Sequence, residues 1–309
     1  MTNLQQNSHP KYLWWDGELV EWDKATVHVT DMEWVGTSAV FEGIKAYRNP
    51  EEDRSFIFRL DDHMRRLDDS MRLMNMHAKW TWPQLSEAVV SLCRANTVKS
   101  DMYVRPFAYF GRGTPLMAER PEHILITTTP FTSTLKTGKT MTAGISSWTR
   151  IGDNVMPPRI KSEANYRNSQ LAANEARRNG YDEAIILNDR HTVAEAAWAC
   201  VMIVKRGRLI TPPVTAGLLE SVTRAALLTM TTEQLNMPTE EREIDRTELY
   251  LADEVFLCGT GYEVTPIVSV DRYQVGDGQI GPVTSHLIDL YHDVVRGLDA
   301  PYDAWRTVI

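Results

Sequence analysis

A polar stretch without periodicity near the middle of the sequence most constrains what this chain can fold into. Residues 132–140 read TSTLKTGKT and follow neither the alternation of a strand nor the three-four spacing of a helix. The chain has 309 residues, the length of two domains at about 100–200 residues each. We therefore expect a small N-terminal domain over 1–130, an interdomain loop over 131–140 and a large C-terminal domain over 141–309.

The N-terminal part combines strand patterns with two helices. Apolar residues flank Asp16-Gly17, which predicts a hairpin over 12–22. Apolar residues from Leu60 to Met74 recur at steps of three and four, which predicts an amphipathic helix whose methionines lie in the core. A second helix is expected to start near Pro83. Further strands are predicted over 44–47, 55–59, 102–110 and 123–129.

The second half alternates between helix and strand patterns. Helices are predicted over 163–179, 221–235 and 282–296, and Gly180 is a typical residue to end the first of them. Strands are predicted over 183–187, 201–204, 209–211 and 254–258. The mixture indicates an α+β fold, and periodicity alone leaves open whether the sheets form pseudo-barrels or sandwiches.

Composition excludes several classes of protein. The formal net charge of -8 argues against a nucleic-acid partner, which requires a basic face. No run approaches the roughly 18 apolar residues of a membrane span, and no signal-peptide pattern is visible. The cysteines are few and far apart, so no disulfide framework is implied. We expect a cytoplasmic protein without membrane or nucleic-acid partners. The cysteines are Cys93, Cys200 and Cys258.

Several common catalytic motifs are missing from the sequence. It contains no Walker-A loop, HExxH, CxxC or GxSxG pattern, and its eight histidines show no metal-ligand spacing, so no metal site is expected. Residues 111–113 begin like a dinucleotide-binding fingerprint, but Pro115 and Leu116 follow and the third glycine is missing. A simple turn is the better interpretation of that segment.

A set of segments, in order over residues 36–284, resembles the class IV aminotransferases, the group that contains branched-chain and D-amino-acid aminotransferases. Each segment alone is weak evidence for the family, and the resemblance depends on the order and spacing of the whole set. The segments are FEGIKAY at 41–47, Phe58-Arg59 followed by His63, Arg66 and Ser70, YVRP at 103–106, K-x-x-x-N-Y at 161–166, Glu195, LESVTR at 219–224, YLADE at 250–254 and GTGYEVTP at 259–266.

This resemblance implies a two-domain fold type IV enzyme with a small α/β N-terminal domain, a larger pseudo-barrel C-terminal domain and the cofactor pyridoxal 5′-phosphate (PLP). The implied reaction is transamination between an apolar, branched-chain amino acid and 2-oxoglutarate by a ping-pong mechanism. The implied assembly is a homodimer or a multiple of dimers, because in the family a neighbouring subunit completes the site.

The residues that match the family's cofactor site are of the types that PLP chemistry requires. Lys161 is implied as the catalytic amine that bonds the cofactor and carries a proton, a role that needs burial or nearby cations. Glu195 is implied as the anion that keeps the ring nitrogen protonated, since a carboxylate among alanines needs a partner. The other implied cofactor contacts are Tyr166 to the phenolic oxygen, and Arg59, Ser221, Val222, Thr223 and Thr260 to the phosphate.

Each of these residues also has an ordinary structural interpretation. Lys161 is expected on the solvated surface if it is an ordinary lysine. Glu195 is expected at the polar rim of the protein surface if it is an ordinary glutamate. Tyr166 is expected in the core if it only packs, and Ser221 needs no ligand if it only caps the helix that it precedes.

Substrate contacts follow from the same resemblance. Tyr103 and the backbone of Thr260 and Gly261 are implied to hold the α-carboxylate, and Arg105 the distal carboxylate of glutamate or 2-oxoglutarate. The remaining implied contacts are Gly43, Lys45 and the aromatic residues Phe41, Tyr47 and Trp148. For Phe41 and Trp148, packing in the core is an equal alternative.

Three segments depart from the family pattern. Residues 196–200, AAWAC, replace a glycine-rich run that ends in asparagine, Ser221 replaces a frequent glycine, and residues 113–120 form a shorter loop than the branched-chain group has. These departures concern substrate range rather than cofactor use. They leave open an (R)-selective amine or D-amino-acid transaminase, and a PLP lyase of the aminodeoxychorismate type is a further alternative. A non-enzymatic binding protein would leave Lys161 and Glu195 without a role.

Overall fold

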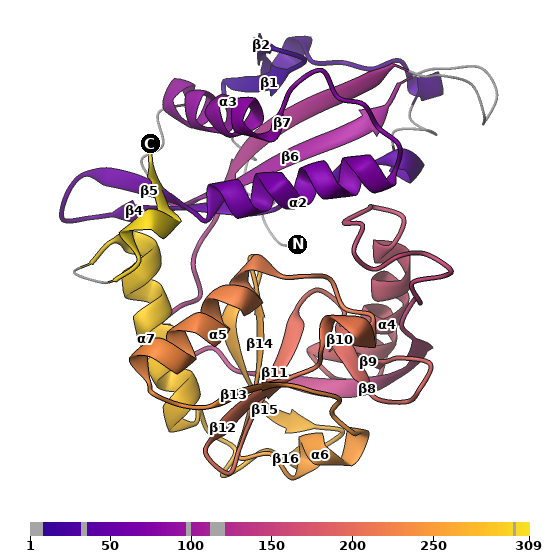
Figure 1. Ribbon diagram of the computed structural model, residues 1–309, viewed down its shortest axis with the longest axis vertical. Helices are drawn as coiled ribbons and strands as arrows, with labels where there is room; N and C mark the ends of the chain where they lie inside the picture. Colours follow the sequence, from indigo (N-terminus) through magenta and orange to yellow (C-terminus); the bar gives the residue numbers. More distant parts are fainter. Residues whose placement is uncertain (1–8, 32–35, 97–99, 112–120, 299–300) are drawn as a thin grey trace, which may run out of the picture. The chain divides into compact units, whose positions relative to one another are not determined.

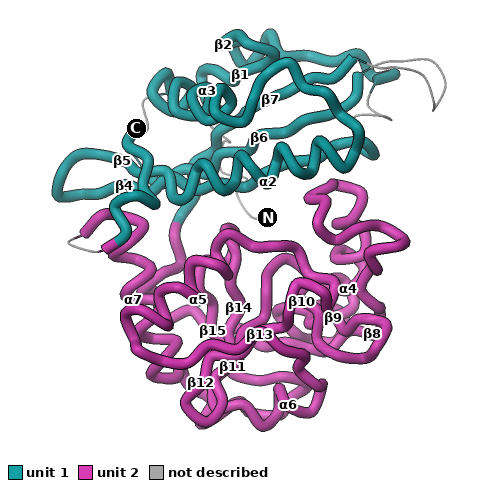
Figure 2. The backbone as a smooth tube through the Cα atoms, in the orientation of Figure 1, with its two compact units in different colours: residues 1–132, 302–309 teal, residues 133–301 magenta. Residues whose placement is uncertain are grey.

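The chain forms two compact units, each with its own sheet (Figure 2). The computed structural model describes residues 9–31, 36–96, 100–111, 121–298 and 301–309. Unit 1 comprises Met1–Thr132 with Tyr302–Ile309, and unit 2 comprises Ser133–Pro301. The expected C-terminal domain over 141–309 therefore requires a correction at its end, because residues 306–308 form a strand that pairs with the sheet of unit 1.

The sheet of unit 1 is antiparallel and combines pairs of strands that are neighbours in the sequence with pairs that are far apart in it. Its order in the described residues is β17-β5-β4-β6-β7-β1-β2, and β3 also pairs with β6. The predicted hairpin around Asp16-Gly17 is confirmed. The strands are β1 Tyr12–Trp15, β2 Glu18–Glu21, β3 Val40–Phe41, β4 Ile44–Asn49, β5 Arg54–Phe58, β6 Met102–Phe110, β7 Glu122–Pro130 and β17 Arg306–Val308; the short 3-10 turns are η1 Trp22–Lys24, η2 Val29–Asp31 and η4 Asp303–Trp305.

Two helices of unit 1 pack against this sheet and against each other, as Figure 1 shows. Helix α2, Leu60–Leu73, buries its apolar face, including Met64 and Met71, which confirms that these methionines lie in the core. Helix α3, Trp82–Ala95, begins with a capping box between Thr81 and Gln84, which satisfies N–H groups that the first turn leaves free.

The sheet of unit 2 is mixed. Within the described residues its order is β10-β9-β8-β15-β14-β11-β12-β13, with β16 paired to β15. Strand β8 runs parallel to both β9 and β15, and β12 runs parallel to β13. The strands are β8 Met141–Thr149, β9 Glu183–Leu187, β10 Val193–Ala196, β11 Cys200–Lys205, β12 Arg208–Thr211, β13 Thr239–Glu241, β14 Glu254–Gly259, β15 Glu263–Val270 and β16 Tyr273–Gln274.

Helices pack against the sheet of unit 2 at different strands. Helix α4, Tyr166–Arg178, lies on β8 and β9, whereas α5, Val222–Gln234, and α7, Pro282–Arg296, both pack on β14 (Figure 1). The short α6, Arg246–Tyr250, packs on β15, and η3, Val214–Ala216, is a single 3-10 turn. Helix α4 starts three residues later than predicted, because residues 163–165 form a turn before it.

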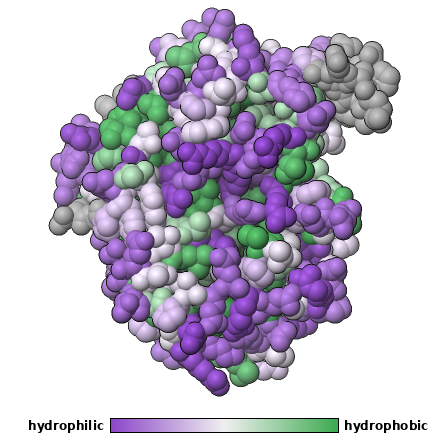
Figure 3. Space-filling view, in the orientation of Figure 1, coloured by the Kyte–Doolittle hydropathy of each residue, from purple (hydrophilic) through white to green (hydrophobic). Residues whose placement is uncertain are grey.

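One face of the molecule is shown by hydropathy in Figure 3. The face in Figure 3 is mostly hydrophilic, with apolar residues in separate small patches. In the described ranges, no helix combines the length and the apolar character needed to cross a membrane.

Helix α7 begins on a buried carboxylate. Glu254, 6% exposed, accepts hydrogen bonds from the backbone N–H groups of Val283 at 2.9 Å and Thr284 at 2.7 Å, and from the Thr284 hydroxyl at 2.5 Å. These donors belong to the first turn of the helix, where N–H groups have no partner inside the helix. A Cβ on Gly281 would overlap this carboxylate, so only glycine fits beside it.

We expect Gly281→Ala to lower the free energy of unfolding by about 1–3 kcal/mol, because the added methyl group displaces the Glu254 carboxylate. The φ of Gly281 is -71°, so the loss arises from overlap and not from backbone strain. Urea unfolding of the wild type and of the Gly281→Ala variant measures the loss of unfolding free energy. Gly152→Ala is the matched control, since nothing lies within 4 Å of the Cβ it would gain. Equal stabilities of the Gly281→Ala variant and the wild type would contradict the prediction.

Candidate active site

Lys161 lies in the loop before α4, and the side-chain amide of Asn165 helps to fix this loop. Asn165 Nδ2 donates hydrogen bonds to the carbonyl groups of Pro157 and Ile160, both at 2.9 Å. Lys161 Nζ in turn donates to the hydroxyl of Tyr166 at 2.6 Å. Because Tyr166 is the first residue of α4, the start of the helix places a phenol next to the amine.

Glu195, on β10, is a buried carboxylate with two partners in unit 2. Its exposed fraction is 6%. Oε1 lies 2.5 Å from Nη2 of Arg150, and Oε2 accepts the backbone N–H of Leu219 at 3.1 Å. Burial raises the pKa of Glu195 above its ordinary value, while Arg150, the Leu219 N–H and the charge of Lys161 oppose that rise.

Arg150 is the residue of this site that sequence reasoning missed. It follows β8 and is 7% exposed. Besides Glu195, it donates from Nε to the carbonyl of Gly217 at 3.1 Å and from Nη1 to the hydroxyl of Ser169 at 3.4 Å. Arg150 compensates the buried charge of Glu195, and the pairing of this acid with the ring nitrogen of a cofactor stays a prediction. A carboxylate has about four acceptor positions, so it can still accept one more N–H.

The predicted phosphate-binding segment opens α5. Ser221 is the N-cap, and its Oγ accepts the backbone N–H of Arg224 at 3.2 Å. The capping interpretation of Ser221 is therefore confirmed, and Val222 and Thr223 form the buried first turn. The remaining free N–H groups and the positive end of the helix suit an anion.

Thr260 and Gly261 lie in the turn between β14 and β15, and the two residues that follow them are anchored. After it, the carboxylate of Glu263 accepts the Ser133 hydroxyl at 2.9 Å and the Thr134 N–H at 2.8 Å. Next to it, the Tyr262 hydroxyl donates a short hydrogen bond to the buried Glu183. The turn that contains two candidate residues is thus held by contacts of Tyr262 and Glu263 on its C-terminal side.

In unit 1, candidate substrate residues come together on adjacent strands. Lys45 on β4 lies opposite Tyr103 on β6. A Cβ on Gly43 would overlap the Tyr103 hydroxyl, so the ring can take this position only over a glycine. Lys45 Nζ lies 4.2 Å from the centroid of the Phe131 ring, a distance typical of a cation–π contact.

Arg105 lies between two aromatic rings of the same sheet. Its guanidinium carbon is 4.9 Å from the ring centroid of Phe41 and 5.3 Å from that of Phe107. Phe41 is 8% exposed in unit 1. The packing alternative for Phe41 thus accounts for its burial, and it also presents a flat face that orients Arg105.

Buried charges anchor the segment that carries Phe41 and Gly43. Glu42 is fully buried and lies 2.7 Å from His63 Nδ1 and 2.7 Å from Arg66 Nε. Burial would raise the pKa of Glu42, but Arg66 and His63 outweigh it and hold this pKa well below its ordinary value. Helix α2 therefore fixes the position of the 41–45 segment through its side chains.

Arg59 precedes α2 in a left-handed conformation, with a φ of 51°. In unit 1 its Nε is paired with Asp62 at 2.6 Å and its guanidinium lies 4.7 Å from the Trp305 ring centroid. Its guanidinium is thus oriented by residues of unit 1, and phosphate binding by Arg59 stays a prediction.

The remaining aromatic candidates differ in burial. Trp148, on β8, is 44% exposed, whereas Tyr47 is fully buried and packs edge-on against Phe131. The ring of Tyr47 therefore belongs to the core of unit 1. The shortened loop over 113–120 and most of the 111–113 fingerprint lie outside the described residues.

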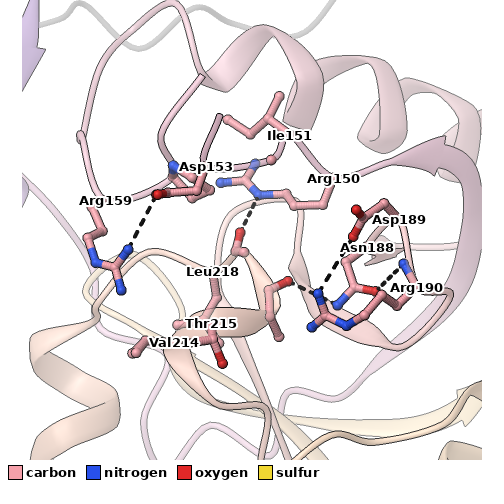
Figure 4. Close-up of a pocket in the computed structure, with 14 residues that line it drawn as sticks. Arg150, Ile151, Asp153, Arg159, Asn188, Asp189, Arg190, Val214, Thr215 and Leu218 are labelled. Atoms are coloured by element: carbon pink, nitrogen blue, oxygen red, sulfur yellow. Dashed lines mark hydrogen bonds and ion pairs between the residues drawn. The ribbon is translucent and has the colours of Figure 1, made fainter. Parts of the chain in front are cut away.

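A small cavity adjoins Arg150 on the side of Gly217 (Figure 4). Its volume is about 160 Å³, below the roughly 300–1,000 Å³ of small-molecule sites. Arg159 and Asp153 form an ion pair at its edge, at 3.3 Å. Arg150 lines this cavity, whereas neither Lys161 nor Glu195 does.

We expect Arg150→Met to lower the free energy of unfolding by about 3–5 kcal/mol at pH 8, because Glu195 then loses its buried partner. The pKa of Glu195 is raised in the folded protein, so the contribution of this acid to stability falls as the pH rises through that pKa. Without Arg150 the pKa of Glu195 rises further, because Arg150 opposes the rise. The loss should therefore shrink at pH 5, where more of the acid is protonated. Urea unfolding of the cofactor-free protein at both pH values measures this difference.

The double variant Arg150→Met/Glu195→Gln is the matched control. With no ionisable acid at position 195, its stability relative to Glu195→Gln should not depend on pH. A loss for Arg150→Met that is equal at pH 5 and pH 8 would contradict the assignment of the ion pair.

Comparison with known proteins identifies the family. The profile described as amino-transferase class IV matches residues 39–270. A probable branched-chain-amino-acid aminotransferase from Aquifex aeolicus is 38% identical over 300 residues, which cover 96% of each chain. Branched-chain aminotransferase structures match from Thermobaculum terrenum in its PLP form (47% identity, 98% and 99% coverage, TM-score 0.95) and from Escherichia coli (34%, 96% and 98%, 0.89).

These matches confirm the family resemblance and the fold type IV class. The residues of unit 2 also fit the family's cofactor, since an amine next to a phenol, a buried carboxylate with free acceptor capacity and a helix N-terminus are the groups that PLP needs. A further matching structure contains pyridoxamine 5′-phosphate. The chain belongs to the class IV aminotransferases and is a PLP-dependent transaminase.

Proposed function

We propose that this enzyme transfers amino groups between branched-chain amino acids and 2-oxoglutarate by a ping-pong mechanism. The observation that carries the proposal is the Lys161–Tyr166 hydrogen bond, together with the buried Glu195–Arg150 pair, in a chain whose relatives bear the branched-chain name. These names support the proposal over an (R)-amine transaminase, a D-amino-acid transaminase or an aminodeoxychorismate-type lyase. The cytoplasmic location and the homodimer, or multiple of dimers, stay predictions.

In the proposed reaction, the residues of unit 2 hold the cofactor and move the proton. Bound PLP supplies an electron sink for the negative charge that develops at the substrate α-carbon. Lys161 provides the amine that bonds to the cofactor and, once freed, accepts and returns the proton at Nζ. Glu195, paired with Arg150, would hold a proton at the ring nitrogen.

Other residues of unit 2 are assigned to binding and orientation. The Tyr166 hydroxyl accepts a hydrogen bond from Lys161 and so restricts the position of the amine. The first turn of α5, with Ser221, Val222 and Thr223, is proposed to bind the phosphate together with Thr260. Arg59 of unit 1 is proposed as a further phosphate ligand because its fork matches a phosphate.

The proposed substrate contacts are assigned residue by residue. The backbone of Thr260 and Gly261 and the hydroxyl of Tyr103 are assigned to the α-carboxylate. Arg105, oriented by Phe41 and Phe107, is assigned to the distal carboxylate of glutamate or 2-oxoglutarate. The side chain of a branched-chain substrate has no charge, so it forms no ion pair with Arg105. Gly43, Lys45, Phe41 and Trp148 stay predicted substrate contacts.

Lys161→Ala should abolish turnover while the fold is retained, because one residue supplies both the covalent link and the proton carrier. Borohydride reduction of the wild-type holoenzyme, followed by peptide mapping, identifies the labelled residue. We expect the pyridoxyl group on Lys161. Circular dichroism of the variant controls for folding. A label on any other lysine would overturn the assignment of the site.

Arg105→Ala should separate the two half-reactions. The loss for glutamate and 2-oxoglutarate should correspond to about 2–5 kcal/mol, because their distal carboxylate loses its charged partner, whereas leucine should be affected far less. Stopped-flow measurement of each half-reaction decides this. Arg54→Ala, which removes an exposed arginine of the same sheet, is the matched control and should change neither. Equal losses in both half-reactions would indicate that Arg105 only supports β6.

A further inference from the structure

Trp198 lies in the turn between β10 and β11, where the family pattern has a glycine-rich run. Its indole is stacked on the phenol ring of Tyr166, with centroids 5.7 Å apart and an interplanar angle of 24°. The hydroxyl of that phenol accepts the hydrogen bond of Lys161 at 2.6 Å. Trp198 is therefore separated from the reacting amine by a single side chain.

The backbone on both sides of Trp198 is held firmly. Within the turn, the Ala196 N–H donates to the Ala199 carbonyl at 2.8 Å. The Ala197 N–H donates to the carbonyl of Ala184, on β9, at 3.0 Å. A Cβ built on Gly259 would lie 3.8 Å from the Trp198 carbonyl oxygen, so the turn also packs against the end of β14. The indole thus projects from a fixed support.

The indole also packs against the helix that begins with Tyr166. Trp198 is partly buried on an apolar cluster of small side chains from α4 and its neighbouring strands. Because these side chains are mostly alanines, the tryptophan fills space that a glycine at this position would leave empty. The Tyr166 ring is therefore supported on one face by a large planar group. The cluster consists of Ala172, Ala173, Ala176, Ala184, Ile186 and Ala197.

We propose that Trp198 is a positioning residue that holds the Tyr166 hydroxyl at Lys161 and thereby speeds the covalent capture of PLP. The inference rests on the proposed role of Lys161. In the capture step, the neutral Lys161 nitrogen bonds to the aldehyde carbon of PLP. The aldehyde oxygen leaves as water together with both hydrogens of the amine. A fixed phenol keeps the nitrogen in one orientation for this attack, and a mobile phenol does not.

Capture of PLP by the cofactor-free protein tests the proposal. The rate is followed by the absorbance change, and the product is reduced with borohydride and mapped to Lys161. Trp198→Ala should slow capture about 2- to 10-fold, the range that a stacked aromatic pair supplies. Trp198→Leu, which keeps apolar volume without a ring, should slow it similarly, and Trp198→Phe should restore the rate to within about twofold.

The Tyr166→Phe background distinguishes positioning from packing. If Trp198 acts through the Tyr166 hydroxyl, then Trp198→Ala should cause no further slowing once that hydroxyl is gone. Equal slowing in both backgrounds would overturn the proposal, as would wild-type capture rates in Trp198→Ala or Trp198→Leu. A label on a lysine other than Lys161 would instead refute the proposed function itself.

Trp80→Ala is the matched control. Trp80 is a partly buried tryptophan in an aromatic pair with Trp14, with ring centroids 5.3 Å apart, and it belongs to unit 1. Its removal should lower thermal stability and leave the capture rate unchanged. A capture rate reduced as much as in Trp198→Ala would show that loss of any such tryptophan slows the reaction, and would overturn the specific role of Trp198.

Discussion

The buried ion pair between Arg150 and Glu195 determines how the parts of unit 2 that carry the site meet. A carboxylate removed from water needs positive charge or hydrogen-bond donors from the protein. Arg150 supplies the charge, and its other donors reach the carbonyl of Gly217 and the hydroxyl of Ser169. One guanidinium therefore connects the end of β8, strand β10, helix α4 and the loop before α5. The amine and the helix N-terminus of the site both depend on these connected parts.

Other buried glutamates join distant segments in the same way. Glu42 connects the 41–45 segment to α2, Glu254 connects β14 to α7, and Glu263 connects β15 to residues 133–134. Each carboxylate accepts from two or more donors, so a small displacement would leave a buried charge without a partner. Such contacts fix positions more strictly than apolar packing, which tolerates exchange of similar volumes.

Sequence patterns predicted the regular elements of this chain better than its long-range contacts. Strand β6 and helix α7 have the bounds that alternation and helical spacing predicted. Strands β8 and β15 were not predicted, because β8 contains glycine and serines without alternation and β15 contains Pro266. Resemblance to the family indicated Lys161 and Glu195. The pairing of Glu195 with Arg150 joins residues 45 positions apart, and no local pattern reports such a contact.

The return of the C-terminus to unit 1 has a consequence for how the protein is made. Strand β17 covers β5, and its register pairs Arg306 with Phe58 and Val308 with Phe56. Residues 306–308 therefore complete a sheet whose other described strands all precede residue 131. Until β17 pairs with it, β5 is an uncovered edge, open to pairing with another nascent chain. Unit 2, which is continuous in sequence, can finish folding before the unit that precedes it.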